Sequence, residues 1–333
     1  MPIKIPKKII KLYFVDFYPN FVLQNNYFYD LISREYEIIL DQDNPEFIIY
    51  SSFGFDHLKY NCTKIYYTGE NDSPNFNICD YALSFMHIEF GDRHFRLPNF
   101  VTYFQHKALF QSSETSTELS SKSRFCNFIV SSSNGDPIRE QFFNALATYK
   151  KVDSPGKFLN NNEELSNNSD WAYSKLDFMK KYKFSIVFEN SSISGYTTEK
   201  LMHAFLAKTI PIYWGNPDVY KDFNTNSFIN FHDYNSIDSV VKKVIEIDNN
   251  DELYFRMIHA NKFNNNLPDY FDDNKIINFL KKIFENQSLL AKRIPQYGFL
   301  QNYVGINFYP KITYVERGFI YSSLKKIKKA IFK

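Results

Sequence analysis

The sequence has 333 residues, enough for two domains of ordinary size, each with its own hydrophobic core. Hydrophobic residues make up 44% of the chain and charged residues 23%, which is the composition of a globular protein. The 39 Lys and Arg residues nearly balance the 37 Asp and Glu residues, and this excludes a general binder of nucleic acid or another polyanion.

Three further features of the sequence bear on the class of protein and its compartment: the aromatic residues, the cysteines and the lack of long apolar runs. The 35 Phe and 25 Tyr residues are what an AT-rich genome would produce, and a role of the surplus rings in stacking on sugars is the alternative. Cys62, Cys79 and Cys126 show no C-x-x-C spacing, which predicts inert thiols in a reduced compartment. No apolar run approaches the ~18 residues of a membrane-spanning helix, and the opening MPIKIPKKII lacks the features of a secretory signal. We therefore expect a cytoplasmic protein.

The first part of the chain alternates short apolar segments with turn-rich pieces, a pattern typical of α/β architecture. The expected strands cover residues 11–17, 37–40, 47–52, 64–68 and 81–85. Residues 111–123, QSSETSTELSSKS, contain a single apolar residue and predict a linker or mobile loop. A first domain should therefore occupy residues 1–110.

The alternation restarts after this linker. Strands are expected at residues 125–131, 184–188 and 209–214, and helices at 138–149, 171–181, 197–208, 237–246 and 274–285. This pattern predicts a second domain over residues 124–290 and a C-terminal segment over 291–333. Two Rossmann-like domains facing a cleft would gather ligands at the carboxyl ends of their strands. The chain has no GxGxxG and no P-loop.

Polar and charged residues are densest between Phe184 and Phe228. Glu189 and Asn190 directly follow an expected strand. Thr197 or Thr198 can cap the next helix, which would leave backbone N–H groups free at its N-terminus for an anion.

The first helical turn of this segment carries the side chains that a ligand would need. Lys200 is unfavourable next to the positive end of the helix dipole, so its presence indicates an outside anion. Tyr196 and Asn190 can donate hydrogen bonds, and Glu199 can accept them from sugar or ribose hydroxyls. Taken singly, each of these residues could equally be an ordinary loop, capping or surface residue. Together they indicate a binding site without naming its ligand.

The sequence pattern FENS…GYTTEK…IPIYWG resembles the donor-binding signature of the α-1,3/1,4-fucosyltransferases, glycosyltransferase family 10. The blocks KIYYTGENDSPNFNICDYALSF, FGDRHFRLP and FIVSSSNGDPIREQFFNAL are similar, in the same order, to upstream blocks of bacterial members. The first forty or so residues and those beyond about residue 290 match only loosely. The resemblance implies a GT-B fold in which the acceptor-binding domain comes first and the GDP-fucose-binding domain second.

The resemblance also implies an activity. GDP-fucose would be the donor, and L-fucose would pass with inversion to a hydroxyl, O3 of GlcNAc, on an N-acetyllactosamine-like acceptor. The products would serve protein glycosylation or the synthesis of lipopolysaccharide and other surface polysaccharides. No other cofactor is obligatory, a divalent metal would at most stimulate, and nucleic acid is not a partner. The residues that match donor contacts of the family are Arg139, Asn190, Tyr196, Glu199 and Lys200.

Glu70, in the block YTGEN, matches the carboxylate proposed to be catalytic in the family. An inverting transfer needs one carboxylate to take the acceptor proton and cations to hold the leaving diphosphate, and Glu70, Arg139 and Lys200 are residues of these kinds. His203 stands where the family has a carboxylate or amide, and residues 191–195 differ in detail, which bears on how fucose is held. Two alternatives stay open: a donor with another nucleotide-linked deoxysugar, and a non-catalytic glycan-binding protein of the same fold.

Two further segments carry predictions. Asp41-Gln42-Asp43 satisfies the D-x-D metal signature of other glycosyltransferases, but it lies far from the donor motif and precedes Asn-Pro, so we interpret it as a turn and assign no metal. The tail Tyr321–Lys333, YSSLKKIKKAIFK, spaces its apolar residues as in a helix with lysines between them. It resembles the basic amphipathic tails of bacterial family members and predicts peripheral contact with the inner face of a membrane. A solvated basic tail is the alternative.

Overall fold

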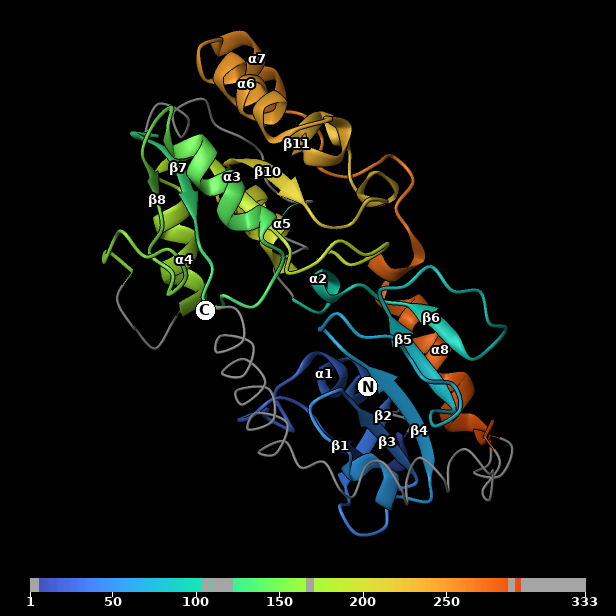
Figure 1. Cartoon of the computed structure of the whole chain (residues 1–333). Coiled ribbons are helices and arrows are strands. Elements are labelled where there is room, and N and C mark those ends of the chain that lie inside the picture. Colours follow the sequence, from blue (N-terminus) through green and yellow to red (C-terminus); the bar gives the residue numbers. More distant parts are fainter. Residues whose placement is uncertain (1–5, 104–108, 110–121, 166–170, 287–290, 295–333) are drawn as a thin grey trace, which may run out of the picture. The chain divides into compact units, whose positions relative to one another are not determined.

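The computed structural model describes residues 6–103, 109, 122–165, 171–286 and 291–294 (Figure 1). The chain forms two compact units. Unit 1 comprises Met1–Ser84, Ile88–Phe95 and the chain from Asp273 onward, and unit 2 comprises Phe85–His87 and Arg96–Asp272. Each unit is built on one largely parallel sheet, so the prediction of two Rossmann-like α/β domains is confirmed.

The sheet of unit 1 has the spatial order β2 (Tyr36–Leu40), β1 (Lys8–Val15), β3 (Phe47–Tyr50), β4 (Thr63–Tyr67), β5 (Tyr81–Ser84) and β6 (His94–Arg96). Its strands β1 to β5 run parallel to one another. In the register of this sheet Leu12 lies opposite both Leu40 and Phe47. Because β1, β3 and β4 are parallel neighbours, the segments that follow them leave from the same edge.

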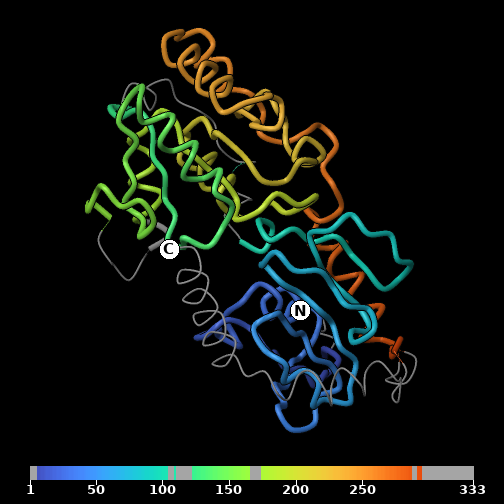
Figure 2. Tube along the Cα trace, viewed as in Figure 1, coloured from blue at the N-terminus to red at the C-terminus, as the bar shows by residue number. Residues whose placement is uncertain are grey.

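Helices α1 (Tyr27–Ser33) and α8 (Asp273–Glu285) belong to unit 1, with the short 3-10 helix η1 (Asp56–Lys59). The Phe284 ring of α8 packs edge-on against Tyr36 and Phe47, with centroids 5.5 and 4.8 Å away. Figures 1 and 2 show α8, orange-red at the end of the described chain, beside the blue strands of unit 1.

The sheet of unit 2 is parallel throughout. Its order is β11 (Ile229–Asn230), β10 (Ile210–Trp214), β9 (Tyr182–Phe188), β7 (Arg124–Phe128) and β8 (Val152–Asp153). Every second residue of β9, namely Phe184, Ile186 and Phe188, enters one hydrophobic cluster. Ser185 and Val187 point to the opposite face and are also buried, so helices cover both faces.

The helices of unit 2 divide between these two faces. Unit 2 contains α2 (Asn99–Thr102), α3 (Ile138–Ala147), α4 (Trp171–Met179), α5 (Glu199–Leu206), α6 (Ile237–Asp248) and α7 (Asp251–Ile258). It also contains the 3-10 helices η4 (Val219–Lys221), η5 (Thr225–Ser227), η6 (Phe231–Asp233) and η7 (Asp269–Phe271). Helix α3 packs on α6 and lies in front of the strands in Figure 1, whereas α5 packs on β9 and β10 together with α4.

Every strand and helix expected from the sequence is present, and no end is displaced by more than three residues. The sequence missed α1, β6, α2, β8, β11 and α7, most of which are short. The unit boundaries differ from the expected ones: residues 273–285 belong to unit 1, and residues 96–103 belong to unit 2. The linker and the basic tail lie outside the described residues, except for residues 122 and 123. No helix within the described ranges is long and apolar enough to cross a bilayer.

A buried ion pair involves Arg96, which directly follows one of the positions in the sequence where the chain changes unit. Within unit 2, Asp222 accepts two hydrogen bonds from the Arg96 guanidinium, at 2.8 and 2.7 Å, and one from the Tyr270 hydroxyl at 2.6 Å. Arg96 also donates to the Phe85 carbonyl at 3.0 Å. The pair therefore anchors the crossing segments in unit 2.

We expect Asp222→Ala to lower the free energy of unfolding by about 3–5 kcal/mol, because it leaves the Arg96 guanidinium without its counter-ion. Urea unfolding followed by circular dichroism measures the change. Asp177→Ala is the control, since it removes only the exposed pair with Lys180 and should change little. If both substitutions lower the free energy of unfolding equally, the buried pair stabilises the fold no more than an exposed pair does.

Candidate active site

The five residues expected to bind the donor all lie in unit 2, and Glu70 lies in unit 1. Asn190, Tyr196, Glu199 and Lys200 occupy the loop after β9 and the first turn of α5. Arg139 lies in the first turn of α3, which follows the loop at the end of β7. The structure brings Arg139 to Asn190, with the guanidinium Nη1 donating to the amide Oδ1 at 3.1 Å.

The carboxylate of Glu189, at the end of β9, is fully buried. It accepts hydrogen bonds from the Thr198 backbone N–H at 2.7 Å, the Thr198 hydroxyl at 2.8 Å and the Lys200 ammonium at 2.9 Å. A side chain at Gly215 would place its Cβ 2.5 Å from the Glu189 Cγ, so glycine leaves room for the acid. Glu189 accepts the N–H of Thr198, the N-cap residue of α5, and the Thr198 side chain caps no N–H of the first turn. An anion seat at the first turn of α5 stays a prediction.

Glu199 and Lys200 lie in a charge-balanced cluster. Burial opposes the charged form of Lys200, but Glu189 and Glu199 outweigh it and raise the pKa of the amine. Burial likewise opposes the charge on Glu199, and Lys200, Lys175 and His203 together hold the pKa of its carboxyl below the ordinary value. Both side chains are therefore ionised at neutral pH, and their charges are already compensated inside the unit.

Arg139 is only 1% exposed, and Asp136 is the acid whose negative charge acts on it. Besides the bond to Asn190, Nη2 donates to the Ser132 carbonyl at 3.1 Å, and the guanidinium lies 5.3 Å over the Phe158 ring. Its Nε has no partner, and no salt bridge joins Arg139 to any carboxylate in the described part of the chain. Burial lowers the pKa of the guanidinium, although Asp136 acts in the opposite direction. A buried cation that forms no salt bridge is a place where an external anion would bind.

Tyr196 and the loop before it are packed against the segment that starts at Phe85. The Tyr196 side chain is buried and its ring meets Phe85 edge-on at 5.2 Å. Gly195 has a φ of +83°, donates to the Asn216 side chain at 2.7 Å, and has no room for a Cβ because the Phe85 carbonyl would lie 2.4 Å from it. Only glycine fits at this position, because the backbone of Gly195 closely approaches the backbone of Phe85.

His203 is buried on α5, and its Nδ1 has no hydrogen-bond partner. Burial and the nearby Lys175 lower the pKa of the imidazole to about 3, although Glu199 acts in the opposite direction. The ring is therefore neutral in the folded protein at physiological pH. A neutral imidazole differs from the carboxylate or amide expected at this position.

Glu70 follows β4 through Thr68 and Gly69, and its side chain is exposed. Its backbone N–H donates to the Thr68 hydroxyl at 3.0 Å, and its carbonyl accepts from the Asp72 N–H at 2.8 Å. The backbone is held while the carboxylate is open, as a group that meets a substrate requires.

The D-x-D segment is a turn, as predicted. The Asp41 carboxylate accepts from the Asp43 and Asn44 N–H groups at 3.2 and 2.8 Å and pairs with Lys11 at 3.0 Å. No group of three His, Cys, Asp or Glu side chains within the described ranges could hold a metal ion. The cysteines are unpaired, and burial raises the pKa of the Cys62 and Cys79 thiols to about 11 and 12.

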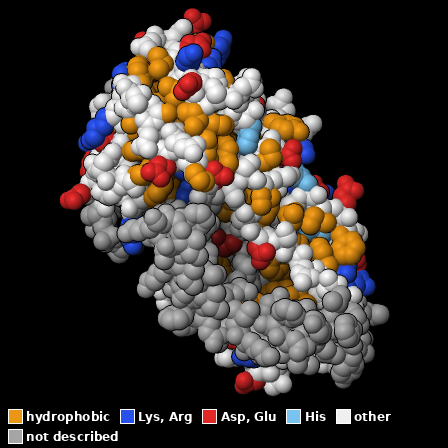
Figure 3. Space-filling view, in the orientation of Figure 1, with side chains coloured by type: hydrophobic (Ala, Val, Ile, Leu, Met, Phe, Trp, Pro, Cys, Tyr) orange, Lys and Arg blue, Asp and Glu red, His pale blue; other side chains and the backbone are white. Residues whose placement is uncertain are grey.

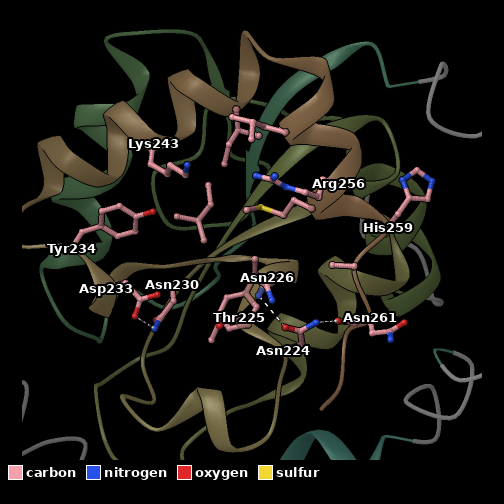
Figure 4. Close-up of a pocket in the computed structure, with 16 residues that line it drawn as sticks. Asn224, Thr225, Asn226, Asn230, Asp233, Tyr234, Lys243, Arg256, His259 and Asn261 are labelled. Carbon is pink, nitrogen blue, oxygen red and sulfur yellow. Dashed lines mark hydrogen bonds between the residues drawn. The ribbon is translucent and has the colours of Figure 1, made fainter. Parts of the chain in front are cut away.

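A pocket of about 720 Å³ lies elsewhere in unit 2, between η5, β11, α6 and α7 (Figure 4). None of the five expected donor residues lines it. Its amides bond to their neighbours: Asn230 donates to Asp233 at 2.8 Å, and Asn224 donates to the Asn261 carbonyl at 2.8 Å. In Figure 3 basic and acidic side chains are interspersed on the described surface. The pocket is therefore distinct from the donor site that the sequence predicts.

Sequence reasoning missed the roles of Glu189, Asn216 and Lys175. Glu189 was noted at the end of a strand, but nothing in its position identified it as the partner of Lys200. The available signal was an acid that ends an apolar strand, FSIVFE, shortly before a helix whose first turn carries a lysine. Opposite charges so placed are expected to pair.

Two family models match the chain. Residues 12–103 match the α-(1,3)-fucosyltransferase FucT N-terminal domain, and residues 119–276 match the C-terminal part of glycosyltransferase family 10 (fucosyltransferase). The boundary between the two matches falls close to the predicted linker.

Individual proteins are similar as well. The α-(1,3)-fucosyltransferase FucT of Helicobacter pylori is 32% identical over 80% of this chain, which spans 63% of that protein's length. A human 4-galactosyl-N-acetylglucosaminide 3-α-L-fucosyltransferase 9 is 30% identical over 46% of the chain and 42% of its own length. A solved α1,3-fucosyltransferase with GDP-fucose covers 86% of the chain, and the chain covers 93% of it, with a TM-score of 0.73 and 29% identity.

The neutral state of His203 predicts a pH dependence of stability. The pKa is about 3 in the folded protein against an ordinary 6.5, so between these values the unfolded chain binds more protons and stability falls as pH is lowered. His203→Gln removes this proton uptake, and its free energy of unfolding should decline less steeply from pH 6.5 to 4 than that of the wild type. Urea unfolding at several pH values tests this, with the exposed His259→Gln as control. Parallel curves for wild type and His203→Gln would contradict it.

Proposed function

Because the chain belongs to glycosyltransferase family 10, the fucosyltransferases, we propose that it is an α-1,3-fucosyltransferase that moves L-fucose from GDP-fucose to a glycan hydroxyl. The similar solved enzyme with GDP-fucose supports this donor. For the acceptor we propose O3 of GlcNAc in an N-acetyllactosamine-like glycan, which the name of the human relative supports. Synthesis of surface polysaccharide is the pathway we propose.

The observation in this chain that carries the proposal is the buried guanidinium of Arg139, which forms no salt bridge among the described residues and whose Nε has no hydrogen-bond partner. A diphosphate would supply the missing anion, because the planar guanidinium can donate two parallel hydrogen bonds to phosphate oxygens. Lys200 would add a point charge whose position Glu189 already holds. Groups that are held in place before the substrate arrives stabilise developing charge without reorganising.

The remaining donor residues suit the sugars of the nucleotide. The Glu199 carboxylate stays ionised, so it can accept hydrogen bonds from hydroxyls of ribose or fucose. Asn190 holds Arg139 through its Oδ1, which leaves its amide N–H groups to donate to the donor. Tyr196 would contribute from the same loop.

The reaction we propose is a single displacement. The Glu70 carboxylate takes the proton of the acceptor hydroxyl as its oxygen forms a bond to the anomeric carbon of fucose. The bond from that carbon to GDP breaks on the opposite side, so a β-linked donor gives an α-fucoside. Arg139 and Lys200 stabilise the negative charge that develops on the leaving diphosphate.

Two alternatives differ in what they require of these residues. Another nucleotide-linked deoxysugar would use the same cations, and residues 191–195 with the neutral His203 would then decide the sugar. Initial rates with a panel of nucleotide sugars distinguish this case. A non-catalytic glycan-binding protein is disfavoured by Arg139, since a neutral glycan offers no anion to a buried guanidinium.

We further propose that the enzyme is cytoplasmic and touches the inner face of a membrane through Tyr321–Lys333, which lie outside the described residues. The support is the sequence: five lysines and no acid from Ser323 to the end. Each lysine near an anionic surface contributes roughly 1 kcal/mol, so several together hold a protein reversibly.

Glu70→Gln should lower kcat by about 10²–10⁴-fold, because glutamine keeps the size of the side chain and loses its basicity. GDP affinity should be unchanged. Arg139→Gln should weaken GDP binding as well as turnover, and it is a cleaner contrast than a change at Lys200, which would leave Glu189 buried without a counter-ion.

Initial rates and calorimetric titration with GDP test both substitutions. Glu89→Gln is the matched control, an exposed acid of the same unit, and it should keep its rate. Near-normal turnover by Glu70→Gln, or loss of activity in Glu89→Gln alone, would reassign the base.

Activity should largely survive EDTA, because Arg139 and Lys200 offset the diphosphate charge themselves. Rates before and after chelation, and after adding back manganese or magnesium, give the measurement. The double variant Asp41→Asn, Asp43→Asn should stay nearly as active as the wild type. Complete loss with EDTA, reversed only by a divalent ion, would contradict the prediction.

A further inference from the structure

A cluster of aromatic side chains lies at the carboxyl edge of the unit 1 sheet and has no part in the mechanism above. This aromatic cluster consists of Phe17, Tyr18, Phe21 and Phe53. Phe17 and Phe21 stack with centroids 4.1 Å apart, and Tyr18 meets Phe21 and Phe53 edge-on at 5.5 and 6.3 Å. Tyr18 is nevertheless 53% exposed, so one large ring stays open to a ligand.

Asp16 fixes the two loops that carry these rings. Its φ is +57°, and its carboxylate, 5% exposed, accepts from the backbone N–H groups of Asp56 and His57 at 3.0 and 2.9 Å and pairs with the His57 Nδ1 at 2.7 Å. The Asp16 carbonyl accepts from the Phe53 N–H at 3.0 Å. A Cβ at Gly54 would lie 2.3 Å from the Asp16 carboxylate. The cluster is therefore a rigid surface, and little entropy would be lost when a ligand covers it.

Hydrogen bonds connect this surface to Glu70 within unit 1. The Ser52 hydroxyl, next to Phe53, lies 2.9 Å from the Thr68 hydroxyl, which accepts from the Glu70 N–H at 3.0 Å. The rings follow β1 and β3, and Glu70 follows β4, the next parallel strand. The aromatic cluster and the proposed base thus stand on one edge, held by the same network.

We propose that the aromatic cluster is the acceptor platform: a pyranose ring of the glycan packs the C–H side of its ring on Tyr18 while a hydroxyl reaches Glu70. This inference rests on the proposed function. Pyranoses have apolar faces that aromatic rings can cover, so the ring of Tyr18 rather than its hydroxyl would make the contact. The occupant is a carbohydrate because the network leads from the rings to the acid that acts on a sugar hydroxyl.

Three variants of the full chain test the platform. Tyr18→Ala removes the open ring, and Tyr18→Phe keeps the ring without its hydroxyl. Tyr220→Ala is the control, a tyrosine of unit 2 that is also 53% exposed. Each is assayed for the KM of N-acetyllactosamine, the KM of GDP-fucose, and N-acetyllactosamine binding without donor by saturation-transfer NMR. Circular dichroism checks that each variant folds.

We expect Tyr18→Ala to raise the KM of N-acetyllactosamine about tenfold, the loss typical of an aromatic anchor, and to weaken its NMR binding signal. The KM of GDP-fucose should not move, and Tyr18→Phe and Tyr220→Ala should resemble the wild type. If Tyr18→Ala binds and fucosylates the sugar normally, or if the wild type does not bind it, the platform is overturned. A wild type that binds the sugar but transfers no fucose refutes the proposed function instead.

Discussion

The carboxylate of Glu189 is fully buried at the end of β9, and hydrogen bonds from Thr198 and Lys200 take the place of its water. Removing such a group from water costs several kcal/mol unless donors of this kind offset it. The donors come from the start of α5, and the space comes from Gly215 at the end of β10. The ends of β9 and β10 and the start of α5 are therefore fixed relative to one another, because all three are needed to accommodate the same buried charge.

This constraint decides how the cations of unit 2 can be used. Lys200 is committed to Glu189, so an arriving anion meets a charge that is already partly compensated. Arg139 is held by hydrogen bonds to neutral groups, the Asn190 side chain and the Ser132 carbonyl, and forms no salt bridge among the described residues. Since Asn190 adjoins Glu189, the same strand end positions both cations. The family motif specifies these residue types, and the structure adds that Lys200 forms a salt bridge whereas Arg139 does not within the described residues.

Hydrophobic periodicity predicted the long strands and helices because each must bury one face or both. It could not say which sheet a helix covers. The buried stripe of α8, with Ile276, Leu280 and Ile283, would suit either sheet, and it belongs to unit 1. The short α1 escaped because its seven residues span too few turns to show a period. At the site, the motif identified Lys200 as a site residue, but it did not identify Glu189 as the partner of Lys200. A contact between a strand end and a helix has no fixed spacing in the sequence by which it could be recognised.

Each unit secures its carboxyl edge with a buried carboxylate, but the two differ in charge. Glu189 is paired with the Lys200 ammonium, and Arg139 adds a buried guanidinium that forms no salt bridge among the described residues. Asp16 is paired with His57, and burial of that imidazole lowers its pKa although Asp16 acts in the opposite direction. A neutral imidazole leaves the Asp16 charge uncancelled, and the exposed Glu70 adds a second negative charge to the same edge. A diphosphate would be repelled there, whereas an uncharged sugar that packs on aromatic rings would not.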